Sequence, residues 1–280
     1  MNATLRRAAT LTLAVAGVTV PLLASRRRRV SEAVQEYESR VTAGGAPPGA
    51  DPYRPDDVAD LPPPVRRYLE AVLSPGQRPV AGARLAQTGE FALGGDWHPF
   101  TASQVYCVSP PGYVWDADIE LFPGVSARVM DAYVEGEGLL RANLLGAVPV
   151  ASAGPDQRMN EAELQRYLSE TPWFPTAVLP AAGVTWEGID ENSARATLRD
   201  GDVHASVVFE FGEEGYVRRL TADRYRQDAD GYAPWVGRYR AYEDRDGIVI
   251  PTEAEVAWET PEGEEPYWRG AVTEVDYRFG

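Results

Sequence analysis

Four side chains that could bind a polar group or transfer protons fall in one short stretch: Glu163, Arg166, Tyr167 and Glu170. If the stretch is a helix, spacings of three and four residues put the three charged groups on one face. That face could bind a polar head group, or its carboxyl groups could donate and accept protons. The alternative is structural, with Asn160 as the helix cap, Glu163 in the capping box and ion pairs that anchor the helix.

A second candidate set is basic. Arg224 and Arg226 alternate along one predicted strand, and Arg238 and Arg240 alternate along another. Successive side chains of a strand point to opposite faces, so each pair shares a face. The guanidinium groups could receive an anionic lipid head group or a phosphate. Pairing with the abundant surface carboxylates is the alternative.

Large aromatic side chains form the third candidate set. Ligand pockets are lined mainly by aromatic and aliphatic groups, so these residues could form the wall of an apolar cavity. A solid core built from large residues would use the same side chains. The members are Trp115, Trp173, Phe174, Trp235 and Trp268, with Tyr167 from the predicted helix.

The composition excludes several kinds of site. One cysteine, Cys107, and two histidines cannot supply an intramolecular disulfide or a structural zinc site with four Cys and His ligands. Cys107 lies in a strand-like apolar run and is predicted to be a packed thiol. Asp228 and Asp230 resemble the start of a calcium loop, but Tyr239 stands where its last ligand, a glutamate, would be needed. We therefore expect no metal and no cofactor.

The charge of the chain is unevenly distributed. All 27 basic residues are arginine, and 42 acidic residues give a net charge of −15. The first 40 residues hold seven Arg and three Glu (+4), and residues 41–280 hold 20 Arg against 39 acids (−19). Nucleic-acid binding by so acidic a body is not expected. The acidic excess without lysine favours a protein adapted to high salt, whereas a preference for Arg codons would explain only the missing lysine.

The first 40 residues are predicted to be a membrane anchor followed by a juxtamembrane helix. Residues 8–25 are uncharged and mostly apolar, and they lie between Arg6-Arg7 and the run Arg26–Arg29. Eighteen residues are at the short end for a membrane-spanning helix. A cleaved signal peptide is the alternative, but no clear cleavage site precedes the four arginines. Because positive charge tends to stay inside, we expect the domain on the cytoplasmic side, with export as the alternative.

The rest of the chain divides into a linker and a domain. Residues 41–57 are rich in Pro and Gly and are predicted to form a flexible linker. Residues 58–280 are predicted to form a single β-rich domain. It begins with a short helix that starts at the proline run after Leu61 and ends before Pro75.

Alternation of apolar and polar residues dominates the domain. Phe100, Ala102, Gln104 and Tyr106 repeat with period two, and Asp-Gly pairs such as the one at Asp200 indicate hairpin turns. These patterns predict a mainly β (α+β) fold. The short, regularly spaced strands suit a sandwich, a barrel or one large curved sheet, and we favour one large curved antiparallel sheet or half-barrel with a few helices on its open face. The helical stretch that runs on from Glu163 to Leu179 is predicted to plug the open face of the sheet.

Leu61 to Phe279 resembles a prokaryotic family of the domain-of-unknown-function type, whose members look like single-anchor membrane proteins. The resemblance implies no catalytic residues. The motifs that carry it are Leu61-Pro-Pro-Pro-Val-Arg-Arg-Tyr-Leu, Trp97-x-Pro-Phe with Ala102 and Gln104, Glu163-Leu-x-Arg-Tyr-Leu-x-Glu with Trp173-x-Pro, Trp186-x-x-Ile-Asp, Arg224-Tyr-Arg, Pro234-Trp235 and Tyr267-Trp-Arg-Gly. The pattern of strands with a helical plug also resembles lipoprotein carriers of the outer-membrane sorting type, a likeness of fold that does not by itself imply function.

These observations favour a membrane-anchored protein that binds an apolar or lipid-like ligand in a curved sheet. One alternative is a hydrolase or isomerase that uses carboxylates such as Glu163 and Asp116. Another is a structural module of the cell envelope that binds a partner protein. The sequence indicates no oligomeric state.

Overall fold

The computed structural model describes the backbone of residues 3–280 and the side chains of residues 21–280 apart from residue 228. Within this part, three α-helices and five short 3-10 turns accompany one large sheet. The helices are α1 (Ala3–Thr42), α2 (Pro63–Val72) and α3 (Gln157–Glu170). The 3-10 turns are η1 (Pro55–Val58), η2 (Thr171–Trp173), η3 (Pro175–Val178), η4 (Pro180–Ala182) and η5 (Gln227–Ala229).

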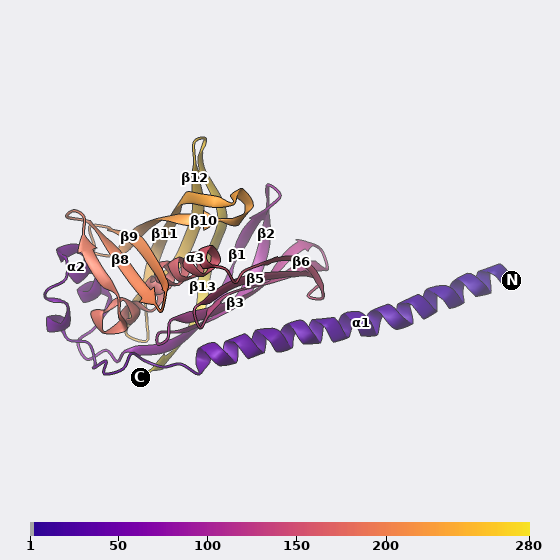
Figure 1. Cartoon of the computed structure of the whole chain (residues 1–280), viewed down its shortest axis with the longest axis horizontal. Helices are drawn as coiled ribbons and strands as arrows, with labels where there is room; N and C mark the ends of the chain where they lie inside the picture. Colours follow the sequence, from indigo (N-terminus) through magenta and orange to yellow (C-terminus); the bar gives the residue numbers. More distant parts are fainter. Residues whose placement is uncertain (1–2) are drawn as a thin grey trace.

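The described strands form one antiparallel sheet of 13 strands, which confirms the predicted fold class. Its order is β6-β5-β4-β3-β2-β1-β13-β12-β11-β10-β9-β8-β7, and the sheet is curved (Figure 1). The strands are β1 (Val80–Leu93), β2 (Asp96–Cys107), β3 (Gly112–Phe122), β4 (Val125–Val134), β5 (Glu137–Leu144), β6 (Val148–Ala153), β7 (Thr185–Gly188), β8 (Ser193–Asp200), β9 (Val203–Phe211), β10 (Val217–Arg226), β11 (Gly231–Arg245), β12 (Ile248–Thr260) and β13 (Gly263–Phe279).

Two connections give the sheet its shape. The first and last strands pair at the centre, with Val80 opposite Phe279. The two outer strands, β6 and β7, are connected through α3 and η2 to η4, and α3 packs against β4, β5, β9 and β10. The segment that follows Glu163 therefore closes the concave face, as predicted. Its apolar side chains join the main core, where Tyr167, Leu168 and Phe174 are fully buried.

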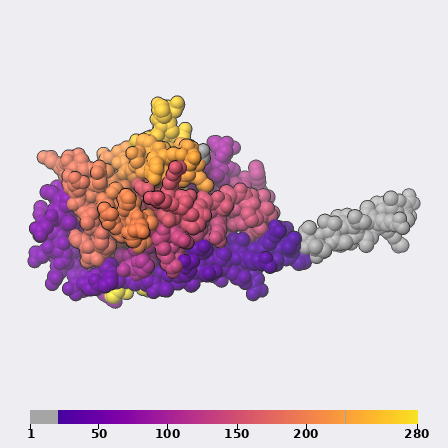
Figure 2. All heavy atoms as spheres, viewed as in Figure 1, coloured from indigo at the N-terminus to yellow at the C-terminus, as the bar shows by residue number. Residues whose placement is uncertain are grey.

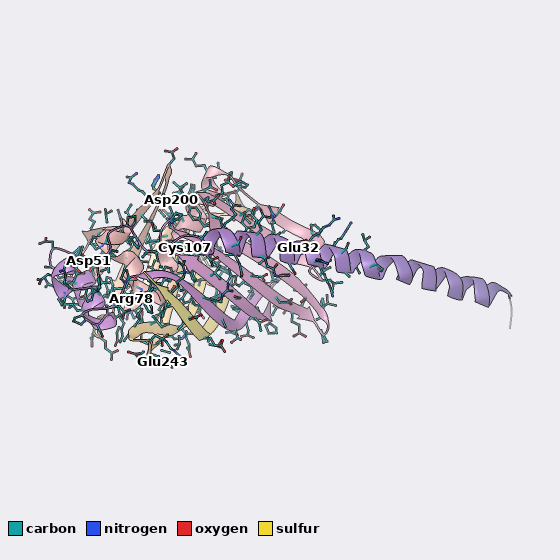
Figure 3. All side chains as sticks on the ribbon, turned by 90° about the horizontal axis from the view of Figure 1, so that it is seen from below. Glu32, Asp51, Arg78, Cys107, Asp200 and Glu243 are labelled. Atoms are coloured by element: carbon teal, nitrogen blue, oxygen red, sulfur yellow. The ribbon has the colours of Figure 1, made fainter. Side chains whose placement is uncertain are left out.

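The convex face of the sheet carries the C-terminal half of α1. Val34 and Val41 pack there in a small second core that includes Cys107, which is the packed thiol expected from the sequence. Polar contacts border this core: the Arg84 guanidinium lies 3.3 Å from a carboxylate oxygen of Glu38. Figure 3 shows the helix lying across the strands on this underside.

The segment 41–57 runs from α1 to the start of the domain along the sheet. Gly45 forms an isolated bridge with Ser109, and the backbone N–H of Tyr53 donates to the carbonyl of Gln77 at 2.8 Å. The Tyr53 side chain is fully buried. The division of the chain into anchor, flexible linker and single domain stays a prediction.

The predicted membrane anchor, residues 8–25, belongs to α1, which extends away from the domain toward the N-terminus (Figure 1). Most of its side chains lie outside the described residues. Among the residues described, no helix combines the length and apolar character needed to cross a membrane. Figure 2 shows the following part of α1 lying against the body of the protein.

Candidate functional site

Helix α3 positions the charged residues of the predicted site under the concave face. The helix begins because the Asp156 carboxylate accepts hydrogen bonds from the backbone N–H groups of Arg158 and Met159, at 2.9 and 3.0 Å. The prediction of Asn160 as the cap is wrong. The amide oxygen of Asn160 instead accepts a hydrogen bond from the backbone of Gly138 on β5, at 2.8 Å, and this bond ties the helix to the sheet.

Arg166 lies at the centre of a buried ionic cluster. Its guanidinium donates to the Asp131 carboxylate on β4 and, at 2.8 Å, to the Glu170 carboxylate one helical turn further on. The same guanidinium lies over the rings of Tyr113 and Trp115, 5.1 and 5.2 Å from their centroids. Burying a carboxylate is costly unless a charged partner offsets the cost, so Arg166 stabilises the buried positions of Asp131 and Glu170.

Glu170 is held by the sheet as well as by the helix. One of its carboxylate oxygens accepts hydrogen bonds from the Gln104 amide at 2.8 Å and from the Tyr106 hydroxyl at 2.9 Å. Gln104 in turn accepts from Gln87, which accepts from the indole N–H of Trp115 at 2.9 Å. This chain of polar groups fixes the position of the α3 C-terminus against β1, β2 and β3.

Glu163 has a different environment from Glu170. It is 4% exposed and accepts a hydrogen bond from the Tyr113 hydroxyl, while its ion pair with Arg224 is long, at 3.6 Å. Burial, followed by the Asp131 carboxylate, raises the pKa of Glu163 to about 7 against the opposing effects of Arg224, Arg166 and Tyr113. Glu163 can therefore gain or lose a proton near neutral pH.

A cavity of about 220 Å³ lies between this cluster and the inner wall of the sheet. Its lining is mostly apolar and rich in aromatic side chains, and the charged groups of α3 pair there with Asp131 of β4 and Arg224 of β10. One water needs roughly 10–15 Å³ of such space, so the cavity has room for an organic group. The main aromatic residues of the wall are Phe91, Trp115, Trp173, Trp235, Trp258 and Trp268.

The structure brings most of the predicted site residues to this cavity and leaves three outside its lining. Tyr167 and Phe174 pack together in the core, with ring centroids 5.7 Å apart. Arg226 lies over the ring of Trp258 and 3.3 Å from a carboxylate oxygen of Glu265. Those that line the cavity are Trp115, Glu163, Arg166, Trp173, Arg224, Trp235 and Trp268.

The two predicted arginines of β10 have different surroundings. Arg224 is buried, lies over the ring of Trp235 and donates from Nε to the Ala162 carbonyl at 3.2 Å. It thus connects β10 to α3. Arg224 therefore neither pairs with a surface carboxylate nor forms an open site for an anion. Its charged partner is the buried Glu163.

Asp116 does not join Glu163. It lies on the convex side of β3, where its carboxylate pairs with Arg128 at 2.8 Å, and Arg128 also donates to Ser31 of α1. The sequence argument missed Asp131, whose buried Oδ1 has no hydrogen-bond partner within the described residues. In the part of the chain that the structure describes, no three His, Cys, Asp or Glu side chains are placed to hold a metal ion.

The fold is similar to several solved structures. A DUF1329 family protein from Desulfovibrio piger is 10% identical, with a TM-score of 0.41 over 72% of this chain and 87% of that one. A LolA superfamily protein from Nitrosomonas europaea is 12% identical, with a TM-score of 0.34 over 77% of this chain and 92% of that one. At these values nothing about ligands or partners transfers to this chain.

Comparison with protein sequences gives one clear result. No curated protein matches the chain. A family model described as a family of unknown function, DUF6920, matches residues 59–277, which is most of the chain. This confirms the resemblance to a domain of unknown function that the motifs indicated. The chain therefore belongs to the DUF6920 family.

Proposed function

We propose that the cavity under α3 binds an amphiphilic, lipid-like molecule. The observation that carries the proposal is the composition of the cavity, whose lining combines many aromatic and aliphatic side chains with a cluster of paired charged groups. Apolar groups are stabilised against the apolar part of this lining because both surfaces leave water. A ligand with an apolar body and a polar end would use both parts of the cavity.

The charged groups of the cavity would receive the polar end of the ligand. Asp131 has an acceptor atom without a partner among the described residues, and Glu163 carries a proton for part of the time near neutral pH. Three carboxyl groups and two guanidinium groups line the cavity. A hydroxyl or amine group that donates to Asp131 would relieve the cost of its unsatisfied oxygen.

We also propose that residues 8–25 hold the protein at a membrane, with the domain on the cytoplasmic side. The support is the uncharged stretch itself and the run Arg26–Arg29 that follows it. A membrane is the natural source of an amphiphilic ligand. A reporter fused after Gly280 would give the side, and activity only of an exported reporter would contradict the cytoplasmic assignment.

The test is lipid extraction from the purified full chain, followed by mass spectrometry. The wild-type protein should retain acyl lipid after exhaustive washing, and Val256→Trp, which fills the cavity from β12, should lose it. Glu255→Trp is the matched control, because it adds the same side chain on the opposite face of β12. Equal lipid content in the two variants would show that the lipid is not held in the cavity.

A second candidate function rests on Glu163 alone. A carboxyl group with a pKa of about 7 beside a tyrosine hydroxyl in a cavity is suited to general acid–base catalysis. Such an enzyme would lose turnover in Glu163→Gln while keeping its bound lipid. If the wild-type protein retains lipid but does not convert it at any pH, the enzyme is ruled out and binding is the function.

A further inference from the structure

Exposed apolar side chains gather at one end of the β1–β6 half of the sheet. Leu93, Phe122, Val148 and Val150 lie at or beside the turns of hairpins β1–β2, β3–β4 and β5–β6. Consecutive hairpins of an antiparallel meander turn at opposite ends, so these three alternate hairpins turn at the same end. Phe122 is 67% exposed and Val150 is 58% exposed. Apolar side chains grouped in this way indicate a contact surface rather than ordinary scatter.

The β3–β4 and β5–β6 turns are poor in charge, whereas the exposed Asp96 follows the β1–β2 turn. A quarter of the residues in the chain are charged, yet residues 121–125 and 142–155 contain no charged side chain. Turns elsewhere in the sheet are acidic, as at Glu135 between β4 and β5 or at Glu213 between β9 and β10. The β3–β4 and β5–β6 turns therefore differ from the acidic turns of the −19 body, which include those at Glu262 and Asp230 in the other half of the sheet at the same end.

Helix α1 adds positive charge at this end. The Arg27 guanidinium donates to the carbonyl of Leu145 in the β5–β6 turn, at 2.6 Å. All four residues of the run Arg26–Arg29 are exposed, and so is Leu22 about one helical turn further toward the N-terminus. Figure 1 shows α1 leaving the domain on the side of the β5–β6 hairpin. Arginines beside apolar side chains complement the anionic head groups and acyl boundary of a bilayer.

We propose that this end of the β1–β6 half, here called the hairpin rim, rests on the surface of a membrane that contains anionic lipids. The rim consists of Leu93, Phe122, Val148 and Val150 together with Arg26–Arg29. The arginines contact the head groups and the hairpin turns enter the interface. The rim does not depend on an occupied cavity. The rim and the cavity wall share strand β1, where Phe91 of the wall lies two residues from Leu93.

Single cysteines labelled with an environment-sensitive fluorophore test the contact in the full chain, bound to phosphatidylcholine vesicles with and without phosphatidylglycerol. Phe122→Cys and Val150→Cys report on the rim. Ile189→Cys is the matched control, because it is 50% exposed in the β7–β8 turn at the opposite end. Burial raises the pKa of the Cys107 thiol, so reagents should modify the introduced cysteine, and the labelled wild type measures any background.

Labels at 122 and 150 should shift to shorter wavelength and be quenched by brominated lipid, whereas the label at 189 should stay water-exposed. The effect should weaken without phosphatidylglycerol or when Arg26–Arg29 are replaced by Gln. Vesicle-bound protein whose label at 122 stays as water-exposed as that at 189 would overturn the proposal while leaving the anchor at residues 8–25 intact. If the label at 122 becomes buried at high protein concentration without vesicles, the rim is a contact between copies of the protein. That result would also overturn the proposal.

Discussion

The raised pKa of Glu163 makes a quantitative prediction about stability. In the unfolded chain the carboxyl has its ordinary pKa of 4.5, and in the folded protein its pKa is about 7. Below both values the carboxyl is protonated in either state and costs nothing. As pH rises, the unfolded state loses its proton first, so stability falls through this interval and levels off above pH 7.

The size of the loss follows from the two values. Each pKa unit corresponds to about 1.36 kcal/mol, so the whole interval from 4.5 to about 7 costs roughly 3 kcal/mol. Most of it, roughly 2–3 kcal/mol, falls between about pH 5 and about pH 8. Glu163→Gln keeps an acceptor for the Tyr113 hydroxyl but cannot ionise, so the variant should lack this contribution.

Urea unfolding of the full chain at about pH 5 and at about pH 8 measures this loss of stability. The stability of wild type relative to Glu163→Gln should fall by roughly 2–3 kcal/mol from the lower to the higher pH. Taking the difference removes the contribution of other titrating groups. Glu213→Gln, in an exposed turn, controls for the change in net charge. A constant difference between wild type and Glu163→Gln across this range would refute the reasoning.

Three other predictions concern the cluster, a close contact and the surface charge. Arg166→Met should lower the unfolding free energy by about 3–5 kcal/mol in urea, because two carboxylates lose their partner, whereas exposed Arg195→Met should change it little. Gly138→Ala should cost about 1–3 kcal/mol because its Cβ would lie 2.6 Å from the Met159 carbonyl, and Gly45→Ala, in open space, should not. The melting temperature should rise with KCl concentration because salt screens the −19 body; equal stability in dilute and molar KCl would contradict this.

The sheet could be predicted because its signals are local. Alternation identifies strands, and the turns at Gly201 and Gly247 close hairpins with the positive φ values that favour glycine. The start of α3 was misplaced because Asp156 and Asn160 are both good caps. The difference between them is that Asn160 bonds to Gly138 on a distant strand. No local signal reveals that contact.

The charged face of α3 could be predicted from helical spacing, but its partners could not. Asp131, Gln104 and Tyr113 come from three different strands, and their meeting depends on register and curvature. A signal for two of them was present. Gln104 is a polar residue on the same face of its strand as Phe100, Ala102 and Tyr106. Asp131 is a charged residue within an otherwise largely apolar strand. A polar residue on an inward-facing position needs a buried partner.

The pairing of β1 with β13 has a kinetic consequence. On the ribosome, β1 emerges early, and the strand beside it at the centre of the sheet is the last of the 13 to be made. Until then β1 and β12 each have one edge without a partner strand. The residues of the cavity wall are divided between two sets of neighbouring strands, β1–β6 and β7–β12. Contacts so distant in sequence form slowly, so the nascent chain is exposed to aggregation during this time. The cavity is complete only once β13 has been made, because Tyr267 and Trp268 of this strand form part of its wall.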